Sequence, residues 1–71
     1  MINIALISDN KNSINNFLDK IVRSDNINFI PITSSIDTCS HHFDSFILLD
    51  FKNKTEIQNL IGYVVINYKQ Q

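Results

Sequence analysis

The chain has little of what small proteins use to cross-link themselves or to surround a phosphate. Its 71 residues include one cysteine, one glycine, one proline and no tryptophan. A single cysteine, Cys39, excludes an internal disulfide and a zinc site made from cysteine pairs. One glycine and one proline leave little room for a glycine-rich loop around a nucleotide phosphate.

An excess of charge of one sign is also absent. Six basic and seven acidic residues give a net charge of −1, so we expect no direct contact between this segment and nucleic acid. The longest apolar runs, 46–49 and 63–66, are far too short to cross a bilayer. Residues 1–9 lack the basic region and the long apolar stretch of a signal peptide. These absences predict a cytoplasmic protein without membrane contact.

The length limits the chain to one small domain, residues 1–71. A folded chain of this size buries only about 60% of the surface that its unfolded form exposes. An apolar content of 44% argues against disorder. We therefore expect a folded domain of marginal stability, for which a partner chain is a common support.

Four apolar segments predict β-strands. Residues 2–8 form a nearly continuous apolar run rich in β-branched side chains, which is typical of a strand buried on both faces. Residues 27–32 predict a second strand, placed at a sheet edge because Pro31 cannot donate a ladder hydrogen bond. Residues 46–49 are apolar throughout and predict a central third strand. Residues 63–68 predict a fourth strand.

The segments between the strands indicate helices. A stripe at helical spacing predicts a first helix of about three turns, with five residues facing inward: Ile14, Phe17, Leu18, Ile21 and Val22. Residues 33–44 give the weakest signal. They predict either an irregular loop or a short helix with three inward residues, Ile36, Cys39 and Phe43.

A last short helix is expected before the fourth strand. Thr55 and Gln58 match the spacing of a capping box, and Gly62 lies where a helix often ends in a left-handed residue. The helix between them would bury Ile57, Leu60 and Ile61.

The alternation of strands and helices predicts a parallel sheet with right-handed crossovers. In such sheets, functional groups gather at the carboxyl ends of the strands. Asp9 follows the first strand and Asp50 ends the third, so both carboxylates would face one crevice if these strands are adjacent. Either aspartate alone is an ordinary helix cap or strand end. The pair indicates a site, and two carboxylates suit a hard cation such as Mg²⁺.

Residues 6–18 and 46–50 resemble parts of a response-regulator receiver domain. In that family the first strand ends in two adjacent acids just before the first helix, and the third strand ends in the phosphoacceptor aspartate. The resemblance covers nearly the whole chain but corresponds only to the first part of a receiver. It implies an incomplete flavodoxin-like α/β domain of three layers. Its four-stranded parallel sheet would have the order 2-1-3-4, with about three helices.

The resemblance also implies roles for individual residues. Asp50 matches the phosphoacceptor, and Asp9 matches the first metal-binding acid. Asn10 occupies the second acid position without a charge. Lys52 lies where the family lends a backbone carbonyl to Mg²⁺, and Asn67 falls near the position of a Ser or Thr hydroxyl. The lysine of the family's fifth strand has no counterpart in this chain.

The uncharged Asn10 weakens cation binding, and the missing lysine weakens the stabilisation of a transferring phosphoryl group. We therefore expect an atypical receiver-like regulatory protein in signal transduction or transcription control, acting through protein–protein interaction or dimerisation. Phosphorylation would be weak or absent, and the only reaction would be self-phosphorylation of Asp50. Two alternatives stay open: a working phosphoacceptor that uses Asp50 and Mg²⁺, and the N-terminal fragment of a larger DNA-binding response regulator.

The incomplete sheet predicts where a partner binds. A complete receiver covers one sheet face with its first and last helices, and the last is missing here. We expect a partly bare face and an unpaired strand edge, which tends to recruit another strand. The expected interface with a protein partner or a second copy lies on the fourth strand and consists of Tyr63, Val64, Val65, Ile66 and Tyr68.

One further cluster carries residues that bind metals. Cys39, His41 and His42 lie close together in the sequence and are typical zinc ligands. Their spacing matches no familiar structural site, so a buried Cys39 and two solvated histidines are the simpler expectation. Apart from Mg²⁺, no cofactor is expected.

Overall fold

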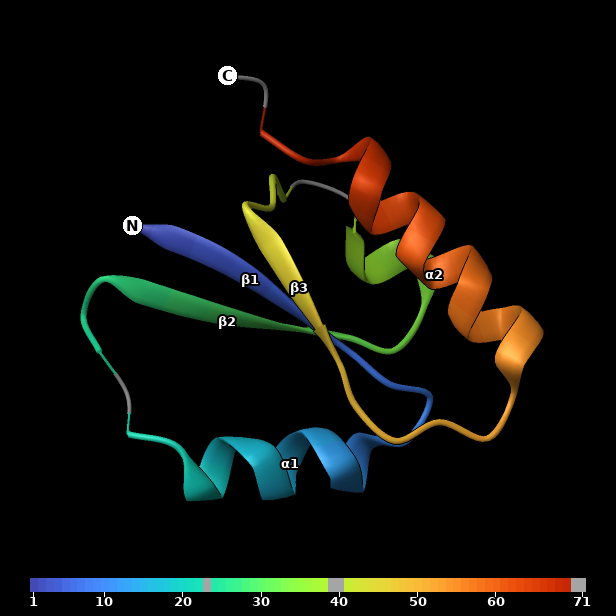
Figure 1. The fold of residues 1–71 in the computed structure, drawn as a ribbon, viewed down its shortest axis with the longest axis horizontal. Coiled ribbons are helices and arrows are strands. Elements are labelled where there is room, and N and C mark those ends of the chain that lie inside the picture. Colours follow the sequence, from blue (N-terminus) through green and yellow to red (C-terminus); the bar gives the residue numbers. More distant parts are fainter. Residues whose placement is uncertain (23, 39–40, 70–71) are drawn as a thin grey trace.

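The computed structural model describes residues 1–22, 24–38 and 41–69, which form an α/β domain (Figure 1). Its sheet contains three parallel strands in the order β2-β1-β3: β1 (Ile2–Ile7), β2 (Ile27–Ile32) and β3 (Ser45–Leu48). The helical elements are α1 (Lys11–Lys20), the short 3₁₀ helix η1 (Ser35–Thr38) and α2 (Lys54–Ile66). The α/β class and the parallel pairing predicted from the sequence are confirmed.

β1 is the central strand. Ala5, Leu6 and Ile7 are completely buried, because β1 has a strand on each side and a helix over each face. A continuous run of aliphatic residues suits this position, since neither face of the strand meets water. β2 lies at an edge, as Pro31 predicted.

β3 is the other edge strand, which corrects the prediction that it is central. It pairs with β1 alone, from Ile4 opposite Ser45 to Ile7 opposite Leu48. It is also incompletely covered by the helices: Phe46 and Ile47 are half-buried, and Ser45 and Leu48 are exposed. A short apolar run therefore indicates a strand here but does not establish its place in the sheet or the burial of its two faces.

α1 covers one face of the sheet. Ile14 is buried there, and the rings of Phe17 and Phe29 meet edge to face with centroids 5.8 Å apart. The helix ends at Lys20, and the extended backbone that follows leaves Val22 98% exposed. The expectation that Val22 faces inward is therefore wrong, because the helix is too short to carry it.

α2 covers the opposite face. Three of its residues, Ile57, Leu60 and Val64, are buried at helical spacing. They join a core cluster whose other members are Ala5, Ile7, Ile30, Ile32 and Phe43. Phe46 and Ile61 pack against this cluster. Both faces of the sheet therefore carry a helix, although β3 stays partly uncovered because none of its four residues is buried.

The predicted fourth strand is wrong, because residues 63–66 form the last turn of α2. Gly62 lies inside the helix rather than at its end, and the apolar stripe continues past it to Val64. The five residues expected to form a strand interface therefore have other places. Val64 is fully buried, Tyr63, Val65 and Ile66 are exposed on the helix, and Tyr68 makes an isolated parallel bridge to Phe43.

Of the two alternatives for residues 33–44, the described part is nearer the irregular loop than the inward-facing helix, because residues 33–38 form a turn and the four-residue η1. The Asp37 carboxylate accepts hydrogen bonds from the Thr33 N–H at 2.9 Å and the Ser34 N–H at 3.1 Å, and these bonds close the turn. Ile36 is 77% exposed, so its expected burial is wrong. Phe43 is fully buried, as expected, and Cys39 lies outside the described residues.

The segment after α2 returns to the start of β3. The Phe43 N–H donates to the carbonyl of Asn67 at 2.9 Å, and the Lys69 N–H donates to the carbonyl of Phe43 at 2.8 Å. Lys69 also forms an ion pair with Asp44, with Nζ 3.4 Å from the carboxylate. This segment therefore covers the sheet edge only where β3 is about to begin.

Candidate functional site

The carboxyl ends of β1 and β3 form a polar rim. Ser8 follows β1 and is completely buried. Its hydroxyl donates to the main-chain carbonyl of Asp50 at 2.6 Å and accepts from the Asn10 N–H at 3.0 Å. The Leu49 N–H donates to the carbonyl of Ile7 at 3.0 Å. These bonds place the segments that carry Asp9 and Asp50 side by side at one end of the sheet.

Asp9 holds the loop between β3 and α2. Its carboxylate accepts two hydrogen bonds from the Lys52 N–H, at 2.9 and 3.0 Å, and one from the Asn53 N–H at 2.8 Å. The Asn53 and Lys52 N–H groups, in that order of effect, hold the pKa of Asp9 below its ordinary value of 3.8. The charged Asp9 carboxylate thus fixes the position of this loop.

Two asparagines beside the rim begin the helices. The Asn10 side-chain oxygen accepts from the Asn12 N–H at 3.0 Å at the start of α1. The Asn53 side-chain oxygen accepts from the Glu56 N–H at 3.0 Å at the start of α2. Asn53 is therefore the cap of α2, in place of the Thr55 capping box expected from the sequence.

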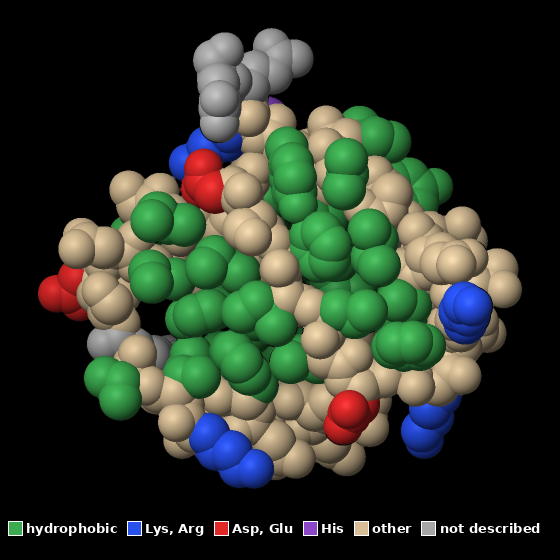
Figure 2. Space-filling model, viewed as in Figure 1, with side chains coloured by type: hydrophobic (Ala, Val, Ile, Leu, Met, Phe, Trp, Pro, Cys, Tyr) green, Lys and Arg blue, Asp and Glu red, His purple; other side chains and the backbone are tan. Residues whose placement is uncertain are grey.

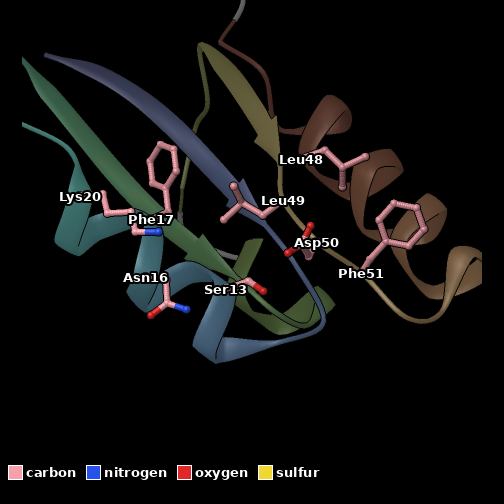
Figure 3. A pocket seen from close by; sticks show the side chains of 8 residues that line it. All are labelled: Ser13, Asn16, Phe17, Lys20, Leu48, Leu49, Asp50 and Phe51. Carbon is pink, nitrogen blue, oxygen red and sulfur yellow. The ribbon is translucent and has the colours of Figure 1, made fainter.

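Asp50 borders an open groove between α1 and β3 (Figure 3). The groove has a volume of about 560 Å³. Four of its residues are polar or charged: Ser13, Asn16 and Lys20 from α1, and Asp50. Its apolar residues are Phe17, Leu48, Leu49 and Phe51. Figure 3 shows Leu48 and Phe51 toward α2 and Phe17 and Leu49 toward α1, with Asp50 between them.

These residues do not form a ready-made Mg²⁺ site. Asp9 and Asn10 already use their side-chain oxygens as hydrogen-bond acceptors, and Lys52 turns its N–H toward Asp9. Among the described residues, no group of three or more His, Cys, Asp or Glu side chains could hold a metal. Binding of Mg²⁺ by Asp9, Asp50, Asn10 and the Lys52 carbonyl stays a prediction, and it requires the loop to rearrange.

Other predicted site residues lie apart from this rim. His41 and His42 are exposed near the opposite end of β3, and the zinc hypothesis also involves Cys39, outside the described residues. In the part of the chain that the structure describes, no helix is long and apolar enough to cross a membrane.

Ser8 is the site residue that sequence analysis missed. The apolar run 2–8 predicts only that Ser8 ends a strand, yet its buried hydroxyl joins two strand ends. A serine that ends an apolar run and precedes an aspartate is a weak signal, since most such hydroxyls meet water. Only the pairing of β1 with β3 gives Ser8 its partner.

The chain was also compared with known proteins. No protein-family model, no curated protein and no solved structure matches it. These comparisons identify no family for the chain, so the resemblance of residues 6–18 and 46–50 to a receiver domain stays a prediction from the sequence.

Proposed function

We propose that this chain is an atypical receiver-like regulatory module, in signal transduction or transcription control, that acts by binding protein rather than by transferring phosphoryl groups. The parallel order β2-β1-β3 is compatible with part of a flavodoxin-like domain. Asp9 and Asp50 follow the two strands that this resemblance requires to be adjacent. A cytoplasmic location fits such a role.

The observation that carries the proposal is the engagement of Asp9. Its carboxylate accepts three backbone hydrogen bonds from residues 52 and 53. A carboxylate in this state stabilises the loop, and freeing it for a cation would leave two N–H groups without their acceptor. The geometry favours a structural use of the rim over a catalytic one.

The alternative is a working phosphoacceptor at Asp50, and one observation favours it. The Asp50 side chain is exposed and borders the groove that also contains Lys20. A cation near the acceptor would offset the charge of a phosphoryl group. The two functions differ in whether Asp50 takes up phosphate.

Mass spectrometry of the intact protein separates these functions. The protein is incubated with Mg²⁺ and a small acyl-phosphate donor, and its mass is compared with that of Asp50→Asn treated in the same way. We expect no stoichiometric phosphoryl adduct on either protein. A stoichiometric adduct on the wild type that Asp50→Asn lacks would establish the alternative and overturn the proposal.

A further inference from the structure

The two edges of the sheet differ in their capacity to bind another strand. The β2 edge contains Pro31, and a proline on an edge strand hinders pairing with another chain. The β3 edge, Ser45–Leu48, contains no proline and no charged residue. Within the described residues, pairing on the outer side of this edge is limited to the bridge between Phe43 and Tyr68. β3 is therefore the edge open to a partner.

The outward backbone groups of β3 can be assigned. The Leu49 N–H donates to the carbonyl of Ile7, so the odd-numbered residues of β3 bond to β1; the Asp44 N–H, just before the strand, also donates to β1, at Asn3. Backbone groups alternate along a strand. Phe46 and Leu48 consequently direct their N–H and C=O groups away from the sheet, where an added strand would meet them.

The open edge belongs to a broad apolar side of the molecule. The Cα atoms span 32 × 30 × 15 Å, and Figure 1 looks down the shortest of these axes with β3 nearest the viewer. Figure 2, from the same direction, shows apolar side chains gathered across the centre of this side. Leu48 and Phe51, which line the groove between α1 and β3, have 41% and 43% of their surfaces exposed.

We propose that this side binds a second copy of the chain through antiparallel pairing of the two β3 strands, which would make one six-stranded sheet. The inference rests on the proposed role in protein binding and names the partner. A two-fold axis beside Ile47 would place Phe46 of each copy opposite Leu48 of the other, so that the outward groups of both residues gain partners.

The size of this side fits a second copy. A stable interface buries about 800 Å² on each partner, and a side of 32 × 30 Å supplies an area of that order. A smaller extended peptide would pair with the strand but leave apolar surface of both helical layers in water. The net charge of −1 adds little repulsion between copies.

The charges at the ends of β3 also suit a two-fold arrangement. Antiparallel pairing brings the carboxyl end of one β3, with Asp50, to the amino end of the other. Lys69 lies at that amino end, with Nζ 3.4 Å from Asp44 and its side chain 43% exposed. The same register places Asp50 of the second copy opposite Asp44, and Lys69 would lie between these two carboxylates and offset part of their repulsion.

Sedimentation equilibrium at micromolar concentration tests the inference with three variants. Leu48→Pro removes an outward N–H and leaves the bonds to β1 in place, and Leu48→Lys adds a charge at the edge. Ile36→Lys is the matched control, because Ile36 is exposed on η1, which follows the opposite edge strand. We expect a wild-type dimer whose dissociation constant rises about tenfold or more in both Leu48 variants and is unchanged in the control.

Amide hydrogen exchange of the wild type supplies a second measurement that needs no variant. Protection of the Phe46 and Leu48 amides should increase with protein concentration, because both become donors only in the dimer. A folded monomer at micromolar concentration, or a dimer whose two amides stay unprotected, would overturn the inference. If the protein is a monomer and takes up no phosphoryl group, the proposed protein-binding function remains, but its partner is a different protein. If the protein is a dimer and does take up a phosphoryl group, the proposed function is wrong and the inferred dimer is kept.

Discussion

The hydroxyl of Ser8 donates a 2.6 Å hydrogen bond to the main-chain carbonyl of Asp50, 42 residues away in the sequence. This bond lies at the point where β1 and β3 end, and Ser8 is completely buried. The Ser8 hydroxyl thus joins the two segments that carry the aspartates, together with the bonds from the Lys52 and Asn53 N–H groups to Asp9.

Replacing Ser8 should destabilise the fold. Ser8→Ala removes two partly buried hydrogen bonds, the one to the Asp50 carbonyl and the one from the Asn10 N–H, and each contributes about 0.5–1.5 kcal/mol. Urea unfolding followed by circular dichroism measures the change in the free energy of unfolding. Ser35→Ala, at an exposed serine of η1, is the control and should change it by less than about 0.5 kcal/mol. Equal effects of the two changes would show that the Ser8 bond is unimportant.

Replacing Gly62 should stabilise the protein. A Cβ at this position meets no atom within 4 Å, and the residue lies inside α2. Alanine at a helix interior gains about 0.5–1 kcal/mol over glycine, which would raise the melting temperature by about 2–8 °C in a domain of this size. Gly62→Pro should cost about 3 kcal/mol or more. If Gly62→Ala instead destabilised the protein, Gly62 would have a left-handed backbone conformation and the helix would end at this residue.

Two adjacent valines in α2 should respond differently to truncation. Val64 is completely buried and Val65 is 47% exposed. Val64→Ala removes two buried methyl groups at about 0.8 kcal/mol each and leaves a cavity, so we expect a loss of about 2 kcal/mol. Val65→Ala should be neutral or slightly stabilising, because alanine favours a helix more than valine does. A clear loss in thermal melts of Val65→Ala would contradict the helix at this segment.

Acid should weaken the fold below about pH 4. Backbone hydrogen bonds lower the pKa values of Asp9, Asp37 and Asp44 from 3.8, with donors led by Asn53, Thr33 and Asn3 respectively. A lowered pKa in the folded state gives stability that is complete well above pH 3.8 and is lost as the pH falls through the folded value. Urea unfolding measured between pH 7 and pH 2 should show that the free energy of unfolding falls at about pH 4 and below.

Asp37→Asn provides the control for this pH dependence. Asparagine cannot carry the charge, so the variant should be less stable at pH 7 and should lose less of its stability on acidification. An identical pH profile in the variant and the wild type would mean that the Thr33 and Ser34 bonds to Asp37 contribute nothing.

The sequence predicted the parts of the fold in which one local signal was decisive. Continuous aliphatic residues identified β1, Pro31 identified an edge strand, and the stripe through Phe17 identified α1. The end of the chain was mispredicted because two signals competed. The run Tyr63–Ile66 favours a strand by its residue types. Ile57, Leu60 and Val64, however, continue a helical stripe. The helix forms because it buries these three side chains against β1 and β2.

The site was predictable only in part, for a different physical reason. The position of Asp9 and Asp50 at strand ends follows from local patterns, and a parallel sheet then brings the ends together. Their hydrogen-bond partners depend on the path of the loop after β3. No local pattern identifies the N–H groups of Lys52 and Asn53 as donors to Asp9.

The two ends of the described chain are neighbours. Lys69 Nζ lies 3.5 Å from the carbonyl oxygen of Met1, at the amino end of β1 and thus a full strand length from the acidic rim. A short peptide linker could therefore join the ends into a circularly permuted chain, with new termini opened at the exposed residues 24–26. An affinity tag or fluorophore attached before Met1 would sit away from Asp50 and the groove, which leaves that surface free during binding measurements.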